Sequence, residues 1–199
     1  KLKDLINYSS SLYLEQGFKF ENNFLQKELS EFLIDRLKFY LKEQKIRHDI
    51  ILASTSSLNL DNAVITYYKA KSLNKIIDNP NGVDILTSYK RASNILDSEV
   101  KNQEINVSNT TDPDIFKTDF EKNLFKRISE LRKYFSSINK DENFETSLTY
   151  LAESKQVIFD FFDNVIVNEG DQSIKKNRLE LIRMLCKTFD NYVNFSLID

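Results

Sequence analysis

The 199-residue chain has little of what breaks a polypeptide into short pieces, since it contains only three glycines and two prolines. A sheet of many short strands needs frequent turns, and glycine and proline are the residues that most often punctuate the chain. Its runs of Leu, Lys, Glu, Ile and Asn favour long helices instead. We therefore expect an all-α protein built as a helical bundle.

A single cysteine and a single histidine restrict the chemistry further. Cys186 alone excludes an internal disulfide and a cysteine cluster for zinc, and His48 alone cannot supply the several histidines of a metal-dependent phosphohydrolase. The sequence also has no signal peptide and no apolar run of 18 residues. We expect a cytoplasmic protein that holds no cofactor or metal in this chain and does not enter a membrane.

Excess charge of either sign is absent too, because 28 basic residues stand against 30 acidic ones. A dedicated nucleic-acid binder usually carries a basic excess, so any contact with RNA must come from a local patch. The chain begins at Lys1, without an initiator methionine, and enters an apolar-periodic segment at once. We interpret this beginning as a sign of a longer polypeptide.

What the chain has in quantity is apolar mass, with 41% hydrophobic residues that include 15 Phe and 9 Tyr. This is enough to bury a core. The turn-forming run 78–82 predicts a boundary between a leading helical region, 1–82, and a second helical domain, 83–199. The polar run 98–111 predicts a surface loop. Apolar spacing predicts helices over residues 1–16, from Asn22 or Asn23 (candidate N-caps) to about 41, 61–77, 83–97, 114–136, 143–167 and 172–195.

Each side chain that could act in catalysis also has a simpler, structural interpretation. His48 and Asp49 are expected at the start of a helix, where Asp49 accepts backbone N–H bonds. Cys186 lies on an apolar stripe and is expected to be a small buried side chain, not a nucleophile. Carboxylates at helical spacing usually form a solvated face, and this is the expectation for Asp61, Asp160 and Asp163.

Basic residues gather in two places, on the predicted helix 83–97 and on the last helix. Lysine and arginine suit phosphates, and arginine and asparagine also hydrogen-bond exposed bases. Judged on the residues alone, a solvated face is the better interpretation of both clusters. Tyr89, Phe161 and Phe162 suit base stacking, but aromatic residues at helical spacing are more often core. The two clusters comprise Lys90 and Arg91, and Lys175, Lys176, Arg178, Arg183 and Lys187.

The order of several sequence blocks makes RNA contact more plausible for these clusters than the residues alone do. These blocks are LKFYLKEQKIRHDII (37–51), YKRASNIL (89–96), DPDIF (112–116), FFDNVIV (161–167) and NRLELIRML (177–185). Each block is weak alone, but in this order the chain resembles the C-terminal, anticodon-binding end of the beta subunit of bacterial glycyl-tRNA synthetase. The part from about Val83 onward also resembles the helical anticodon-binding domain of arginyl-tRNA synthetase, through Tyr89, Arg91, Ile95 and Leu96. The chain departs from the pattern around 168–170 and at Asn194.

The resemblance implies a division of labour. The alpha subunit would use ATP and magnesium to join glycine to tRNA, while the beta subunit grips tRNA(Gly). This chain has no glycine-rich phosphate loop and neither the HIGH nor the KMSKS signature, so we expect no catalytic site in it. The implied partners are tRNA(Gly), the alpha subunit and the rest of the beta subunit, with no DNA and no membrane.

The resemblance also suggests residues that meet RNA. Lys90, Arg91 and Arg178 would contact phosphates or base edges, and Asn94 and Asn177 would supply amide hydrogen bonds. The scaffold beneath them would comprise Leu96, Phe161, Phe162, Val165, Leu179 and Leu181. The alternative interpretation is a helical protein-interaction module, in which the first helices dock the rest of the synthetase and no residue of this chain contacts RNA.

Overall fold

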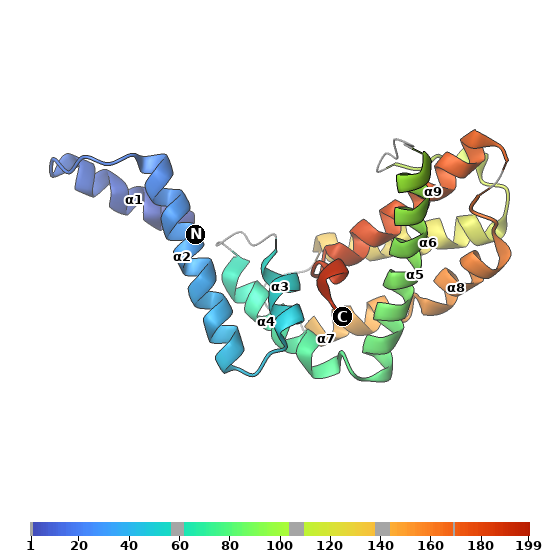
Figure 1. Ribbon diagram of the computed structural model, residues 1–199, viewed down its shortest axis with the longest axis horizontal. Helices are drawn as coiled ribbons and strands as arrows, with labels where there is room; N and C mark the ends of the chain where they lie inside the picture. The colour runs from blue at the N-terminus through green and yellow to red at the C-terminus, as the bar shows by residue number, and fades with distance from the viewer. Residues whose placement is uncertain (1, 57–61, 104–109, 138–143, 169) are drawn as a thin grey trace.

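The computed structural model describes residues 2–56, 62–103, 110–137, 144–168 and 170–199, and every regular element in these ranges is a helix (Figure 1). The all-α prediction is confirmed for these residues. The elements are α1 (Leu2–Glu15), α2 (Asn22–Glu43), α3 (His48–Thr55), α4 (Ala63–Ile76), α5 (Pro80–Gln103), η2 (Pro113–Ile115), α6 (Asp119–Ser137), α7 (Phe144–Ala152), α8 (Lys155–Asn164), α9 (Gln172–Asp190) and η3 (Phe195–Leu197).

The body of the molecule is organised around α5, which packs against α7, α8 and α9. Helix α6 closes the far side by packing on α8 and α9, and α4 packs on α7. Helices α1 and α2 extend away from this body to one side, and α2 reaches α3 and α4 (Figure 1). The described bundle therefore carries a projecting arm, which we define as residues 2–43.

The hydrophobic core crosses the boundary predicted at 78–82. One continuous cluster contains Leu41 and Ile50 from the leading helices together with Leu124, Phe161 and Leu181 from the later ones. Each of these five side chains is fully buried. The division into 1–82 and 83–199 stays a prediction, but the two parts share a core.

Two glycines shape the chain where helices meet. Gly17 follows α1 with φ of 87°, a left-handed conformation that costs glycine little, and this confirms the predicted end of the first helix. Gly82 lies in the first turn of α5, where an added Cβ would lie 2.3 Å from the carbonyl oxygen of Ile77. Only glycine allows the end of α4 and the start of α5 to approach so closely. Pro80 opens α5 at a position where its missing N–H costs nothing.

Several predicted boundaries differ from the structure. Helix α5 continues to Gln103, so residues 98–103 are helical and not part of a loop, while 104–109 lie outside the described residues. Helix α9 ends at Asp190, five residues before the predicted limit. Asn22 lies inside α2, and Glu21 occupies the N-cap position. Asp61 and residues 138–143 also lie outside the described residues.

The predicted helix 143–167 is divided into α7 and α8 at Glu153 and Ser154. Arg127 of α6 stabilises the break, because its Nη2 donates to the Tyr150 carbonyl (2.6 Å) and its Nε donates to Ser154 Oγ (2.9 Å). Its guanidinium also lies 4.1 Å from the centre of the Tyr150 ring. A carbonyl left without a helical partner at the end of α7 is thus satisfied from a neighbouring helix.

Candidate nucleic-acid interface

The outward face of α5 presents two of the residues predicted to meet RNA. Lys90 and Asn94 are one helical turn apart and both are exposed. Tyr89 on the same helix points the other way and packs against Phe189 and Phe195. The helix therefore places a cation and an amide toward solvent while an aromatic residue fixes its orientation from inside.

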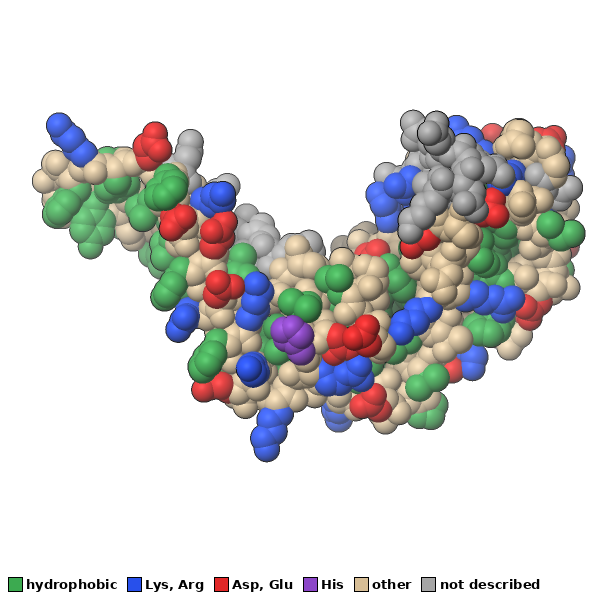
Figure 2. Space-filling view, in the orientation of Figure 1, with side chains coloured by type: hydrophobic (Ala, Val, Ile, Leu, Met, Phe, Trp, Pro, Cys, Tyr) green, Lys and Arg blue, Asp and Glu red, His purple; other side chains and the backbone are tan. Residues whose placement is uncertain are grey.

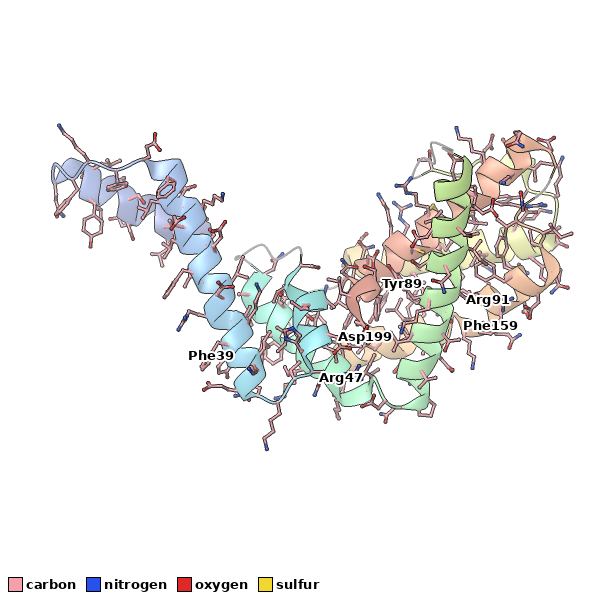
Figure 3. The ribbon with its side chains drawn as sticks, viewed as in Figure 1. Phe39, Arg47, Tyr89, Arg91, Phe159 and Asp199 are labelled. Atoms are coloured by element: carbon pink, nitrogen blue, oxygen red, sulfur yellow. The ribbon has the colours of Figure 1, made fainter. Side chains whose placement is uncertain are left out.

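Arg91 continues this surface toward α8, where it meets two aromatic rings. Its guanidinium carbon lies 5.0 Å from the ring centre of Phe159 and 5.1 Å from that of Phe162 (Figure 3). The same guanidinium pairs with Asp163 at 2.5 Å. A planar cation held against aromatic faces is a rigid, partly exposed platform.

Lys155, the first residue of α8, extends the same surface. Its ammonium pairs with Asp84 of α5 at 2.7 Å and lies 5.9 Å from the ring centre of Phe159. Helices α5 and α8 are in direct contact, and Arg91 and Lys155 both lie beside the Phe159 ring, so they share one surface; Figure 3 shows Arg91 near Phe159. We call this surface the α5–α8 patch, and it comprises Lys90, Arg91, Asn94, Lys155, Phe159 and Phe162.

Asn177, also predicted to meet RNA, is buried and binds the chain before α6. Its Oδ1 accepts from Thr111 Oγ1 and from the Asp112 backbone N–H, each at 2.7 Å. Its Nδ2 donates to the Asp112 carbonyl at 2.9 Å. Both ends of the amide are used within the protein. In this structure Asn177 therefore supports the DPDIF turn, and its contact with RNA stays a prediction.

Arg178 is buried as well, and its contact with RNA likewise stays a prediction. Its Nε donates to Glu121 Oε1 at 2.9 Å and its Nη1 to the Ile166 carbonyl at 2.8 Å. Burial alone raises the pKa of Glu121, but hydrogen bonds from Arg178 and Thr118 outweigh it and hold that pKa below its ordinary value. The pair joins α9 to α6 inside the molecule.

Lys175 follows the same pattern on α9. Only 1% of its side chain is exposed, and its ammonium pairs with Glu99 of α5 at 2.7 Å and with Asn168 Oδ1 at 2.5 Å. Lys176 and Lys187 are exposed on this helix. The basic cluster predicted on the last helix is therefore divided between the interior and the surface, and only the α5 cluster forms a continuous outward patch with aromatic residues.

A family model for the DALR anticodon binding domain matches residues 85–196, which include the whole α5–α8 patch. The chain belongs to this family. Curated relatives agree with the match, and each is named as the beta subunit of a glycine–tRNA ligase. The protein from Rickettsia felis is 34% identical over 98% of this chain, and those from Rickettsia prowazekii and Rickettsia bellii are each 32% identical over 96% and 98% of it. The chain spans about a quarter (26%) of the length of each of these relatives.

The groups that suggested catalysis have structural roles around this DALR domain. Cys186 is buried, and burial together with the nearby Asp190 and Asp97 raises the pKa of its thiol to about 12. Asp49 lies in the first turn of α3 and accepts from the Ile50 N–H at 2.9 Å, as predicted. It also pairs with Arg47 at 2.6 Å. No group of three metal-ligating side chains occurs among the described residues.

The sequence interpretation of the aromatic residues is confirmed in part. Tyr89 and Phe161 are core, as predicted, while Phe162 is only partly buried, packs against the core and lies beside Arg91. Sequence reasoning missed Phe159 and Lys155. Their positions three and seven residues before Phe162 lie on one side of a helix, and that spacing was the available signal.

Within the described ranges, no helix of the DALR protein is long and apolar enough to span a membrane.

Proposed function

We propose that the α5–α8 patch contacts the anticodon arm of tRNA(Gly) and so supports the attachment of glycine to that tRNA. The observation that carries the proposal is the Arg91 guanidinium held against Phe159 and Phe162, with Lys90 and Asn94 beside it, in a domain of an anticodon-binding family. Unstacked anticodon bases are read by stacking on aromatic rings or guanidinium planes and by hydrogen bonds to their edges.

The patch has the parts that such contact requires. Lys90 supplies a cation for a phosphate, Asn94 supplies an amide that both donates and accepts, and Arg91 supplies the stacking plane. The Arg91–Asp163 pair is open to solvent on the carboxylate side, since Asp163 is 59% exposed. A phosphate can replace that carboxylate as the partner of Arg91.

We also propose a division of labour for the complete enzyme, and the naming of the relatives as beta subunits of a glycine–tRNA ligase supports it. Glycine offers no side chain for a pocket to grip, so a check at the anticodon adds discrimination, and the binding energy gathered there orients the acceptor end for reaction elsewhere. Catalysis, with ATP and magnesium, belongs in this proposal to an alpha subunit, and this chain supplies no catalytic residue and no cofactor site. In this proposal the protein acts in the cytoplasm, where tRNA is charged.

The test is binding of the 199-residue chain to a tRNA(Gly) transcript and to the same transcript with a substituted anticodon, at two salt concentrations. We expect tighter binding to the native anticodon. Lys90→Ala should weaken both tRNAs and reduce the salt slope by about one. Arg91→Ala should weaken the native tRNA by about tenfold and reduce the discrimination between the two.

Lys126→Ala is the matched control, because Lys126 is an exposed lysine on α6 that lies outside the patch. It should leave both affinities and the anticodon discrimination unchanged. Equal losses from Lys90→Ala, Arg91→Ala and Lys126→Ala would mean a diffuse basic surface and no anticodon site. Wild-type affinity in both patch variants would exclude the patch altogether.

A second function, protein docking by the arm, is favoured by its exposed apolar side chains. Leu5, Tyr8 and Phe24 are each about 60% exposed, and Phe32 and Phe39 lie on the next turns with more than half of their surface in solvent. Figure 2 shows hydrophobic side chains gathered along this arm. Patches of this kind usually meet another protein surface. We assign the arm to the rest of a beta subunit, since the chain spans only 26% of its relatives.

The arm assignment has its own test. The double variant Phe32→Ser, Phe39→Ser should lose binding to a separately supplied remainder of the beta subunit, while its tRNA affinity stays at the wild-type value. Binding to the alpha subunit in place of that remainder would reassign the occupant. Loss of tRNA affinity in this variant, with an intact patch, would make the arm and not the patch the RNA contact.

A further inference from the structure

A cavity of about 290 Å³ lies between α3, α4 and the turn that follows α9, away from the α5–α8 patch. Its polar lining includes Ser54 from α3, Thr66 and Lys69 from α4, Asn62 just before α4, and Asn191 after α9. Four of these residues precede the part of the chain that matches the DALR family model. The cavity is therefore a feature of the junction between the leading helices and the DALR domain.

Lys69 lines this cavity, and among the described residues its ammonium forms no ion pair with a carboxylate. Its Nζ donates to the Asn191 carbonyl at 2.8 Å and lies 5.3 Å from the ring centre of Tyr192. The ion pairs found among the described residues do not include Lys69. Burial lowers the pKa of Lys69 to about 8, as expected for a cation without a counter-charge.

The acid nearest in the lining, Asp190, does not fill that role. Its Oδ1 accepts from the Phe195 backbone N–H at 3.2 Å and its Oδ2 from the Tyr89 hydroxyl at 3.4 Å. Burial raises the pKa of Asp190, and the cation that opposes this rise is Lys187, not Lys69. Asp190 thus serves η3 and α5, and the positive charge of Lys69 is left for the cavity.

A second polar group in the lining is unsatisfied. The Oγ of Ser54 is buried and has no hydrogen-bond partner among the described residues. A buried hydroxyl without a partner costs free energy, and such groups are unusual in folded proteins. Asn62 adds an exposed amide to the same lining. Three residues with hydrogen-bond donors, Lys69, Ser54 and Asn62, therefore line one cavity.

We propose that this cavity binds a phosphate group carried by a nucleotide or by an RNA strand. A phosphate offers negative charge and several strong acceptor oxygens, which match the donors of Lys69, Ser54 and Asn62. The cavity is larger than one phosphate needs, so an attached ribose or base also has room against the partly apolar wall that includes Ile65. The site does not depend on the proposed role of the α5–α8 patch.

The test follows the side-chain NMR signals of Lys69 in the 199-residue chain during titration with inorganic phosphate, AMP and an RNA trinucleotide. We expect its pKa to rise from about 8 toward the ordinary lysine value on saturation. Lys69→Met should weaken binding by about tenfold or more, and Ser54→Ala by a few-fold. Lys71→Met is the control, because Lys71 is an exposed lysine on α4 outside the cavity.

The pH dependence of the affinity for these probes is an independent test of the proposal. The titratable side chains around the cavity are Lys69 of α4, Asp190 at the end of α9, and Tyr192 in the following turn. Because Lys69 loses its proton as the pH rises through about 8, affinity should fall across that range in the wild type. The fall should be absent in Lys69→Met and preserved in Lys71→Met.

The three probes distinguish the source of the phosphate. Tighter binding of the trinucleotide identifies an RNA backbone, whereas equal binding of AMP and the trinucleotide identifies a free nucleotide. The proposal is overturned if the Lys69 signals do not respond to any probe at about 1 mM, or if Lys69→Met binds as well as wild type. Ser54→Ala removes no hydrogen bond within the described structure. If Lys69→Met fails to fold, the binding affinity of Ser54→Ala therefore tests the proposal, and an unchanged affinity would overturn it. Arg91→Ala should leave AMP binding unchanged.

Discussion

Arg178 and Glu121 form an ion pair inside the protein, with Arg178 Nε 2.9 Å from Glu121 Oε1 and at most 5% of either side chain exposed. The pair connects two helices 57 residues apart in the sequence, α9 and the start of α6. A second bond from Arg178 to the Ile166 carbonyl extends the connection to the segment after α8. An arginine that resembles a surface residue in the sequence is thus a structural support.

Removing the cation should damage the fold. Arg178→Met leaves the Glu121 carboxylate buried without its partner, and breaking such a pair costs about 3–5 kcal/mol. Urea unfolding followed by circular dichroism measures the change. Lys187→Met, an exposed position on the same helix, should change the free energy of unfolding by less than about 0.5 kcal/mol. Similar, small effects from both changes would show that the buried pair contributes little.

The same pair predicts an acid dependence of stability. The folded-state pKa of Glu121 lies below the ordinary value of 4.5, so its stabilisation is fully present above about pH 4.5 and is lost as the pH falls through the lowered pKa. Glu121→Gln should unfold more easily at neutral pH and lose less stability between neutral and acid pH. Asp49, whose pKa is also lowered, keeps some acid dependence in the variant. Parallel pH curves for the two proteins would contradict the prediction.

Neutralising Asp163 should improve tRNA binding. Asp163→Asn frees the Arg91 guanidinium from a competing carboxylate and removes a negative charge near the patch. Because the pair is partly exposed and screened, we expect a gain of about two- to fivefold in affinity at low salt, measured by fluorescence anisotropy. Asp160→Asn on the same helix, where Asp160 accepts from Gln156, serves as the control. A loss of affinity in Asp163→Asn would mean that Asp163 holds Arg91 in its binding position.

Gly82→Ala should be strongly destabilising. The new Cβ would lie 2.3 Å from the Ile77 carbonyl oxygen and 2.4 Å from that of Ile76, and both atoms belong to the backbone. We expect a loss of about 3 kcal/mol, at the upper end of the usual cost of overpacking. Gly170→Ala is the control, since nothing lies within 4 Å of its added Cβ. Thermal unfolding of the two variants makes the comparison, and equal midpoints would show that the α4–α5 junction can relax.

The features that depend on residues close together in the chain could be predicted from the sequence. The rarity of glycine and proline predicted the helical fold, the spacing of apolar residues located the main helices, and a cysteine on an apolar stripe was correctly expected to be buried. The first turn of α3, with Asp49 accepting the Ile50 N–H, was also predictable, because such capping involves neighbours in the chain.

Features that depend on distant partners were not predictable from the sequence. The break between α7 and α8 contains neither glycine nor proline, and the residue that satisfies it, Arg127, comes from another helix. Arg178 and Lys175 lie inside because Glu121 and Glu99 meet them there, although arginine and lysine are usually exposed. Asn177 and Arg178, two of the five residues predicted to contact RNA, are also buried. The RNA contacts of all five residues stay predictions.

The hydrogen bonds between α3 and residues 194–199 have a consequence for the order of folding during synthesis. Asn194 donates to the Ala53 carbonyl at 3.2 Å, and the Asp199 N–H donates to Asp49 at the same distance across 150 positions of the chain. A ribosome that has released α3 and α4 must still extend the chain by more than a hundred residues before these bonds can form. Until then α3 exposes the apolar surface that η3 covers in the folded chain, and exposed apolar surface of this kind favours aggregation during synthesis.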